Sequence, residues 1–82
     1  MTIVDMMGVP TRVGDTILTC SAESREIGRV LEIRELRNHK HIVAELNTDI
    51  DIGYIKPYVR LIYHKNFLNI MGIVEKHPEI FI

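Results

Sequence analysis

One stretch decides the fold of this chain, Arg29-Val30-Leu31-Glu32-Ile33-Arg34-Glu35-Leu36-Arg37. Its glutamates and arginines suit a helix as well as a strand, so the spacing of its apolar residues must decide. On a helix, Ile33 and Leu36 would point well away from the other apolar side chains, which makes a poor stripe. As a strand entered through Gly28, the stretch alternates Leu31 and Ile33 with charged residues. We therefore expect a strand, whereas a helix here would convert the fold to α+β.

Segments on both sides of this stretch also predict strands. Thr16–Ser21 is rich in β-branched residues, as strands are. A turn over Asn38–Lys40 is followed by Ile42, Ala44 and Leu46 on one face, as expected of a half-buried antiparallel partner. The expected strands are, in chain order, Thr16–Ser21, Arg29–Arg37, His41–Leu46, Ile50–Tyr54 and Val59–Tyr63. In the last of these strands, we expect the side chains of Val59, Leu61 and Tyr63 to face the core.

The chain changes to a helical period after the fifth strand. The spacing i, i+3, i+4, i+7 is followed by Phe67, Ile70, Met71 and Val74. Asn66 is a suitable cap, and His77-Pro78 ends the run. We therefore expect a C-terminal helix over Asn66–His77 that packs on the sheet. The whole chain is expected to be a single domain, 1–82, with an apolar arm at 1–10, a five-stranded barrel at 11–64 and the helix and tail at 65–82.

Composition limits the class of protein. The chain has 82 residues, of which 46% are hydrophobic and 26% charged, which is ordinary for one small globular domain. A single cysteine, Cys20, cannot form an internal disulfide. No apolar run has the length of a membrane span or the form of a signal peptide. We therefore expect a cytoplasmic protein without a membrane partner.

Three segments of the chain resemble the small SH3-like barrels of the KOW type. They are Val13-Gly14-Asp15-Thr16-Ile17, Ile27-Gly28-Arg29-Val30-Leu31-Glu32-Ile33 and Ile55-Lys56-Pro57-Tyr58-Val59-Arg60-Leu61-Ile62. In that group, a Gly-Asp opens the first strand, a Gly-x-Val step begins the second, and a short turn leads into the last. The resemblance covers residues 13–62 and implies a strongly bent five-stranded SH3-like barrel.

Residues suited to catalysis or metal binding are few. The histidines His39 and His41 could share one strand face, but neither His64 nor His77 completes a zinc site by its spacing. Cys20 lies in the most β-branched segment and is expected to be buried. No phosphate-binding glycine loop and no nucleophile elbow occur. We expect no enzyme activity, no catalytic residue, no metal and no cofactor.

The expected function is therefore binding, most simply of another protein or of a second copy. Tyr58, beside Pro57, combines apolar area with a polar tip. At the end of the chain, Ile80, Phe81 and Ile82 are more apolar than termini usually are. The apolar start of the chain either completes the core or docks on a partner. A small regulatory accessory factor of a phage or bacterium, acting on a larger host machine, would fit these features.

Nucleic-acid binding is the alternative that the KOW resemblance implies. Its candidate phosphate contacts are Arg25, Arg29, Arg34, Arg37 and Lys40. Ten basic and eleven acidic residues, however, give a net charge of −1, whereas non-specific phosphate binding normally requires a basic excess. Glu23 and Glu26 also occupy a loop in which a nucleic-acid-binding member would usually show lysines. Protein is therefore the favoured partner.

Overall fold

The computed structural model describes residues 2–20, 25–47 and 58–72, and strands dominate this part of the chain. The mainly β fold class is confirmed. The elements are, in order, β1 (Ile3–Val4), β2 (Pro10–Thr11), β3 (Thr16–Thr19), β4 (Ile27–Leu36), β5 (His39–Leu46), β6 (Tyr58–Tyr63), the 3₁₀ turn η1 (His64–Asn66) and β7 (Phe67–Asn69).

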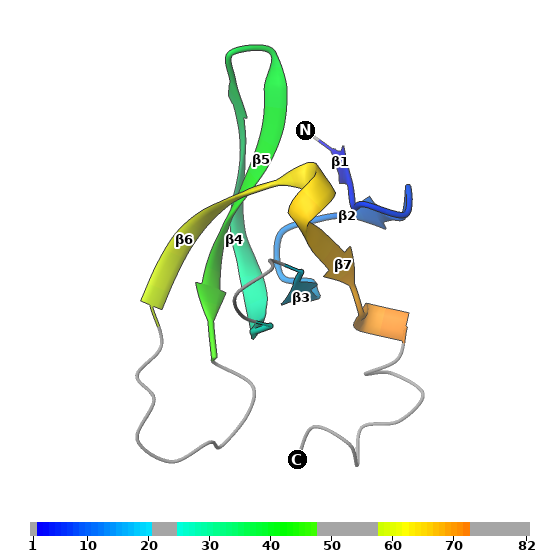
Figure 1. Cartoon of the computed structure of the whole chain (residues 1–82), viewed down its shortest axis with the longest axis vertical. Coiled ribbons are helices and arrows are strands. Elements are labelled where there is room, and N and C mark those ends of the chain that lie inside the picture. Colours follow the sequence, from blue (N-terminus) through cyan, green and yellow to red (C-terminus); the bar gives the residue numbers. More distant parts are fainter. Residues whose placement is uncertain (1, 21–24, 48–57, 73–82) are drawn as a thin grey trace.

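Five of the strands form one antiparallel sheet in the order β6-β5-β4-β3-β7, and β1 pairs with β2 in a separate two-stranded sheet. Figure 1 shows β4 and β5 as a long hairpin, with β6 on one side of it and β7 with the β1–β2 pair on the other. The closed barrel that we expected is not seen among the described residues, where the sheet has two separate edge strands.

The stretch that decides the fold is a strand, as expected, but its turn lies one residue earlier than predicted. Leu36 pairs with His39, so the loop consists of Arg37 and Asn38 alone. Both have positive φ, 52° and 65°, as in the two-residue turns whose twist matches that of the flanking strands. His39 and Lys40 therefore belong to β5.

A bulge in β4 overturns the predicted facing of its side chains. Val30 pairs with Ala44 and Glu32 with Val43, so that Leu31 is an extra residue. Such an insertion shifts the alternation by one. Val30 is consequently buried, Ile33 packs against the core, and Leu31 is 44% exposed. The prediction that Leu31 and Ile33 share a face was wrong for this reason.

The core lies on one face of the five-stranded sheet. Its buried cluster contains Ile3, Ile17, Val30, Ile42, Ala44, Leu46, Ile62 and Phe67. The shared face of Ile42, Ala44 and Leu46 is thus confirmed. In β6 the predicted phase was wrong, because Ile62 points into the core while Val59 and Leu61 are exposed and Tyr63 is half-buried.

At Gly28, the neighbouring strand β5 leaves no room for a side chain. Gly28 pairs with Leu46 on one side and with Ile17 on the other. A Cβ atom at Gly28 would lie 2.8 Å from the Leu46 Cα and would also meet the Glu45 carbonyl. Only glycine permits this backbone approach without a shift of either strand.

The predicted C-terminal helix is wrong at its start. Phe67–Asn69 forms β7, in which Phe67 pairs with Thr19 and Asn69 with Ile17 of β3. The ladder with β3 and the complete burial of Phe67 outweigh the helical spacing, which a short window shares with other conformations. The predicted remainder of this helix beyond residue 72, and the predicted strand Ile50–Tyr54, lie outside the described residues.

The apolar N-terminal arm is joined to the sheet through Asp5, which is only 2% exposed. Its Oδ1 accepts hydrogen bonds from the backbone N–H of Met7 and of Val9, both at 2.8 Å. Its Oδ2 accepts a bond from the backbone N–H of Asn69 at 2.7 Å. Ile3, just before it, packs in the core. The arm is therefore part of the folded domain, although Val4, Met6 and Met7 remain exposed.

Candidate functional site

Strand β6 is an edge of the sheet. All six of its residues pair with β5, from Leu46 and Tyr58 to His41 and Tyr63. Its other side has no strand partner within residues 2–20, 25–47 and 58–72. An edge of this kind presents backbone N–H and C=O groups that a further strand can pair with.

The outer face beside this edge carries exposed apolar side chains. Val59 is 59% exposed and Leu61 44%. Leu61 pairs with Val43 of β5. Leu31, also 44% exposed, is the bulged residue of β4 and directly precedes Glu32, the residue that pairs with Val43. We call these four side chains, Leu31, Val43, Val59 and Leu61, the β6 face. Exposed apolar side chains that form a contiguous group mark interaction surfaces more often than scattered ones do.

The opposite edge of the sheet is protected. The backbone N–H of Met6 donates to the Phe67 carbonyl at 3.1 Å, and Asp5 accepts from the Asn69 N–H. These two bonds occupy groups of β7 that another strand would need. Figure 1 shows the β1–β2 pair on this side of the sheet and β6 on the other. The two edges therefore differ: one is covered by the N-terminal arm, and the other is open in the described part of the chain.

Tyr58, which we predicted as a partner contact, opens β6 and is 38% exposed. Its hydroxyl donates a hydrogen bond to the Glu26 carboxylate, which also accepts from the Asn47 amide at 3.2 Å. The bond to Glu26 is the main cause that raises the pKa of Tyr58; burial adds to it, and Arg60 opposes it. The polar tip of Tyr58 thus joins β6 to the residues before β4, and its ring is the part left for a partner. Ile80, Phe81 and Ile82 lie outside the described residues.

The basic residues of the nucleic-acid alternative do not form one surface. Arg34 pairs with Glu32, Nε to Oε1 at 2.9 Å, and this pair raises the pKa of Arg34 and lowers that of Glu32. Arg29 lies opposite Glu45 on the outer face.

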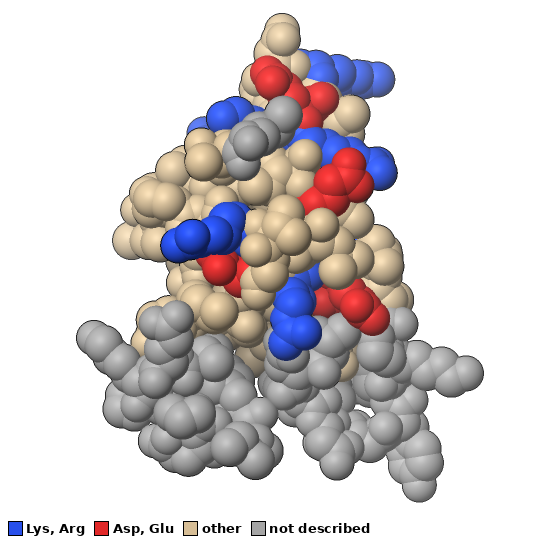
Figure 2. Space-filling view, turned by 180° about the vertical axis from the view of Figure 1, so that it is seen from behind, with Lys and Arg blue, Asp and Glu red and all other residues tan. Residues whose placement is uncertain are grey.

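Lys40 lies opposite Glu35 in the β4–β5 register, on the same face of the sheet as the core residues. Its Nζ donates a hydrogen bond to the Thr2 carbonyl at 2.8 Å. Lys40 is therefore on the other face from Arg34. Arg25 precedes β4, and Arg37 lies in the turn. Figure 2 shows blue and red side chains interleaved on its side of the molecule, without a continuous basic surface.

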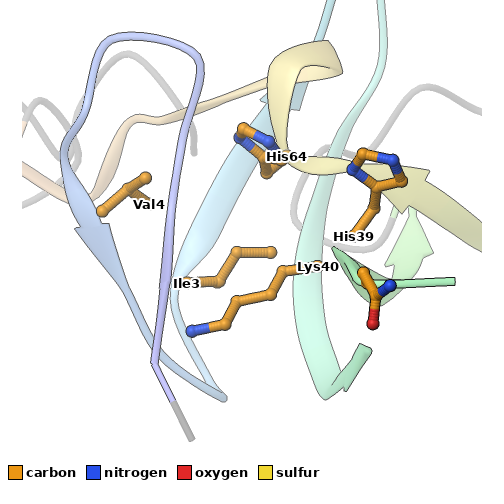
Figure 3. Close-up of a pocket in the computed structure, with 6 residues that line it drawn as sticks. Ile3, Val4, His39, Lys40 and His64 are labelled. Atoms are coloured by element: carbon orange, nitrogen blue, oxygen red, sulfur yellow. The ribbon is translucent and has the colours of Figure 1, made fainter. Parts of the chain in front are cut away.

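A second feature, which the sequence did not reveal, is a pocket beside an aromatic cluster. The Tyr63 ring contacts His39 and His41, with centroids 5.5 and 5.4 Å apart, and His64 at 4.4 Å. A pocket of about 220 Å³ is lined by Ile3, Val4, Asn38, His39, Lys40 and His64. Figure 3 shows the His39 and His64 rings at its rim, with Ile3 and Lys40 side by side below them.

Three segments that are distant in the sequence build this pocket, so only the assembled fold could identify it. Its lining is mixed, with aliphatic side chains below and polar rings at the rim. No group of three or more His, Cys, Asp or Glu side chains in the described ranges could hold a metal ion. Cys20 directly follows β3 and is half-buried, so the expectation that it is buried within a strand was wrong.

Comparison of the chain with models of known protein families, with characterised proteins and with solved structures finds no match. In the part that the structure describes, no helix is long and apolar enough to cross a membrane.

Proposed function

We propose that this chain is a non-catalytic protein-interaction module, a small regulatory accessory factor that binds its partner at the β6 edge and the adjoining β6 face. The observation that carries this proposal is the difference between the two edges of the sheet. Asp5 and Met6 cover β7, whereas the β6 edge next to Val59 and Leu61 is open in the described part of the chain. Nucleic-acid binding receives less support, because acidic residues accompany the basic candidates.

Strand addition is the mode of binding that this geometry favours. An extended segment of the partner would form a backbone ladder with β6, and its side chains would cover Val59 and Leu61. Burial of the exposed part of each of these side chains contributes about 1 kcal/mol. Because strand ladders discriminate weakly, the apolar contacts would supply the specificity.

We also propose that the sheet is a bent SH3-like barrel of the KOW type. Three features support this assignment. The bulge at Leu31 bends the central strand. The turn η1 leads directly into the last strand, β7, and β7 returns beside the first strand of the five-stranded sheet, β3. Fold alone does not assign function, so the binding proposal depends on the β6 edge.

The test is affinity capture from a lysate of the organism of origin, with a tagged chain and identification of the captured proteins by mass spectrometry. The double variant Val59→Thr/Leu61→Thr keeps strand propensity and removes apolar surface. The matched control is Met7→Thr/Val13→Thr, because these residues are 74% and 57% exposed and lie outside β6.

We expect the wild-type chain and the control to capture the same protein, and the β6 variant to lose it. Circular dichroism of both variants must match the wild type. Equal capture by all three chains would remove the β6 edge from the proposed function.

A further inference from the structure

We propose that the partner at the β6 edge is a second copy of this chain, paired antiparallel to the first about a two-fold axis at Leu61. This inference rests on the proposed function of the β6 edge and names its occupant. Three observations carry it: the number of open edges, the residue pattern of β6, and the continuity of the β6 face.

The number of open edges restricts how two copies can pair. A head-to-tail arrangement needs two different edges and can continue into rings or filaments. The β7 edge is occupied by the bonds to Asp5 and Met6, so this arrangement is blocked. Within the five-stranded sheet of the described residues, β6 is the edge left for a second copy. A β6-to-β6 contact is isologous and closes at two subunits.

The residue pattern of β6 selects one register. Residues opposite each other in an antiparallel pair share a face, so the two-fold axis must pass through a residue. Two choices use five of the six residues of Tyr58–Tyr63, namely axes at Arg60 and at Leu61. An axis at Arg60 would set two arginines directly opposite each other, which is destabilising.

An axis at Leu61 avoids this conflict. It places Leu61 opposite its own copy, Val59 opposite Tyr63 of the second copy, and Arg60 opposite Ile62 of the second copy. Arg60 retains its position near Tyr58, where it opposes the rise in the Tyr58 pKa that the bond to Glu26 causes. This register therefore combines the longest ladder with apolar neighbours on the outer face.

The β6 face becomes continuous across such a pair. Leu61 already pairs with Val43, so the outer face would present Val43, Leu61 and then the same two residues of the second copy in one row. β6 also lacks the lysines, prolines and glycines that block strand addition at many natural edges. A five-residue ladder is a small interface, so we expect a dimer that forms reversibly with concentration.

Disulfide cross-linking tests the register directly, in a Cys20→Ala background. Opposite residues in an antiparallel pair have Cα atoms about 4.5–5.5 Å apart, within the range of about 4.4–6.8 Å that a disulfide needs. Leu61→Cys should therefore form a covalent dimer under mild oxidation. Val59→Cys is the matched control, because Val59 would lie about 13 Å along the strand from its own copy at about 3.3 Å per residue.

The control is strict, since Val59 is more exposed than Leu61 and random collisions would favour Val59→Cys. We expect a dimer band for Leu61→Cys, several-fold more intense than for Val59→Cys at equal concentration. A mixture of Val59→Cys and Tyr63→Cys chains should also cross-link more than Val59→Cys alone. Equal or greater cross-linking of Val59→Cys would overturn the proposed register.

Light scattering of the wild-type chain separates this inference from the proposed function. The mass should rise with concentration from 9.5 kDa to twice that value and no further, and Val59→Thr/Leu61→Thr should stay monomeric. A wild-type chain that is monomeric at millimolar concentration overturns the inference. The wild-type chain could be monomeric while Val59→Thr/Leu61→Thr still abolishes capture of the partner protein. In that case, the proposed function stands, and the β6 edge binds a different protein.

Discussion

Asp5 has three backbone hydrogen bonds on one buried carboxylate, to the N–H groups of Met7, Val9 and Asn69. Hydrogen bonds to a charged acceptor are stronger than neutral ones, and a buried donor that loses its acceptor is destabilising. We expect Asp5→Ala to lower the free energy of unfolding by about 2–4 kcal/mol. Urea denaturation followed by circular dichroism measures this change.

The matched control for Asp5 is Met7→Thr, because Met7 is 74% exposed and its backbone N–H is retained. Such a surface change should alter stability by less than about 0.5 kcal/mol. If Asp5→Ala and Met7→Thr had the same unfolding midpoint, the carboxylate would not hold the arm to β7.

Tyr58 gives the chain a dependence on alkaline pH. In the folded state, its bond to Glu26 raises its pKa above the ordinary value of a tyrosine. Because the folded pKa is the higher one, the stabilisation is fully present below the unfolded pKa and is lost as pH rises through the folded pKa. In a spectrophotometric titration, we expect the transition that Tyr58→Phe removes to lie at higher pH in the folded chain than in the urea-denatured chain. The same midpoint in both states would contradict the assignment.

At the scale of elements, Gly28 keeps β4 against β5. The Cβ of Gly28→Ala would meet the Glu45 carbonyl and lie 2.8 Å from the Leu46 Cα, so the strands must separate. We expect a loss of about 1–3 kcal/mol in unfolding free energy, the usual cost of overpacking. Gly72→Ala is the control, since nothing lies within 4 Å of its Cβ position. Similar melting temperatures for the two variants would show that the close approach is not constraining.

Strands in which apolar and polar residues alternate without interruption were predictable from sequence. Features that depend on which strands pair, and in which register, were not. Ile42, Ala44 and Leu46 alternate without interruption, so their shared face was evident. The bulge at Leu31 leaves no local signal, because it depends on which β5 residue each β4 residue meets. β7 was missed because three residues are too few to show a period of two, and its partner β3 is about fifty residues earlier.

At the scale of the whole molecule, the net charge and the pairing of basic with acidic side chains disfavour nucleic-acid binding. The net charge is −1, and Arg34 is paired with Glu32. We expect no retardation of single-stranded or double-stranded RNA or DNA in gel shifts at low salt. Retardation that weakens with salt and disappears with Arg34→Gln/Arg37→Gln would reverse this conclusion and favour the nucleic-acid alternative.

The candidate site was less predictable than the fold. Val59 and Leu61 were recognised as alternating residues of one strand. Whether they face the core or solvent depends on the register of β6 against β5. Whether β6 is an edge depends on the order of all five strands. Tyr63 and its three histidines come together through the pairing of β5 with β6 and through η1. These features are properties of the assembled sheet, which residue spacing does not encode.

The bond from Asn69 to Asp5 spans 64 residues of chain. During synthesis, the arm leaves the ribosome early, but the strand that it must hold emerges only after β3, β4, β5 and β6. Until then, the Asp5 carboxylate lacks its Asn69 partner, and the β3 edge that later receives β7 is exposed. Contacts of such separation form late and slowly. The nascent chain therefore passes through a stage in which it has two unprotected sheet edges rather than one, and this is the stage at which a chaperone would have most to cover.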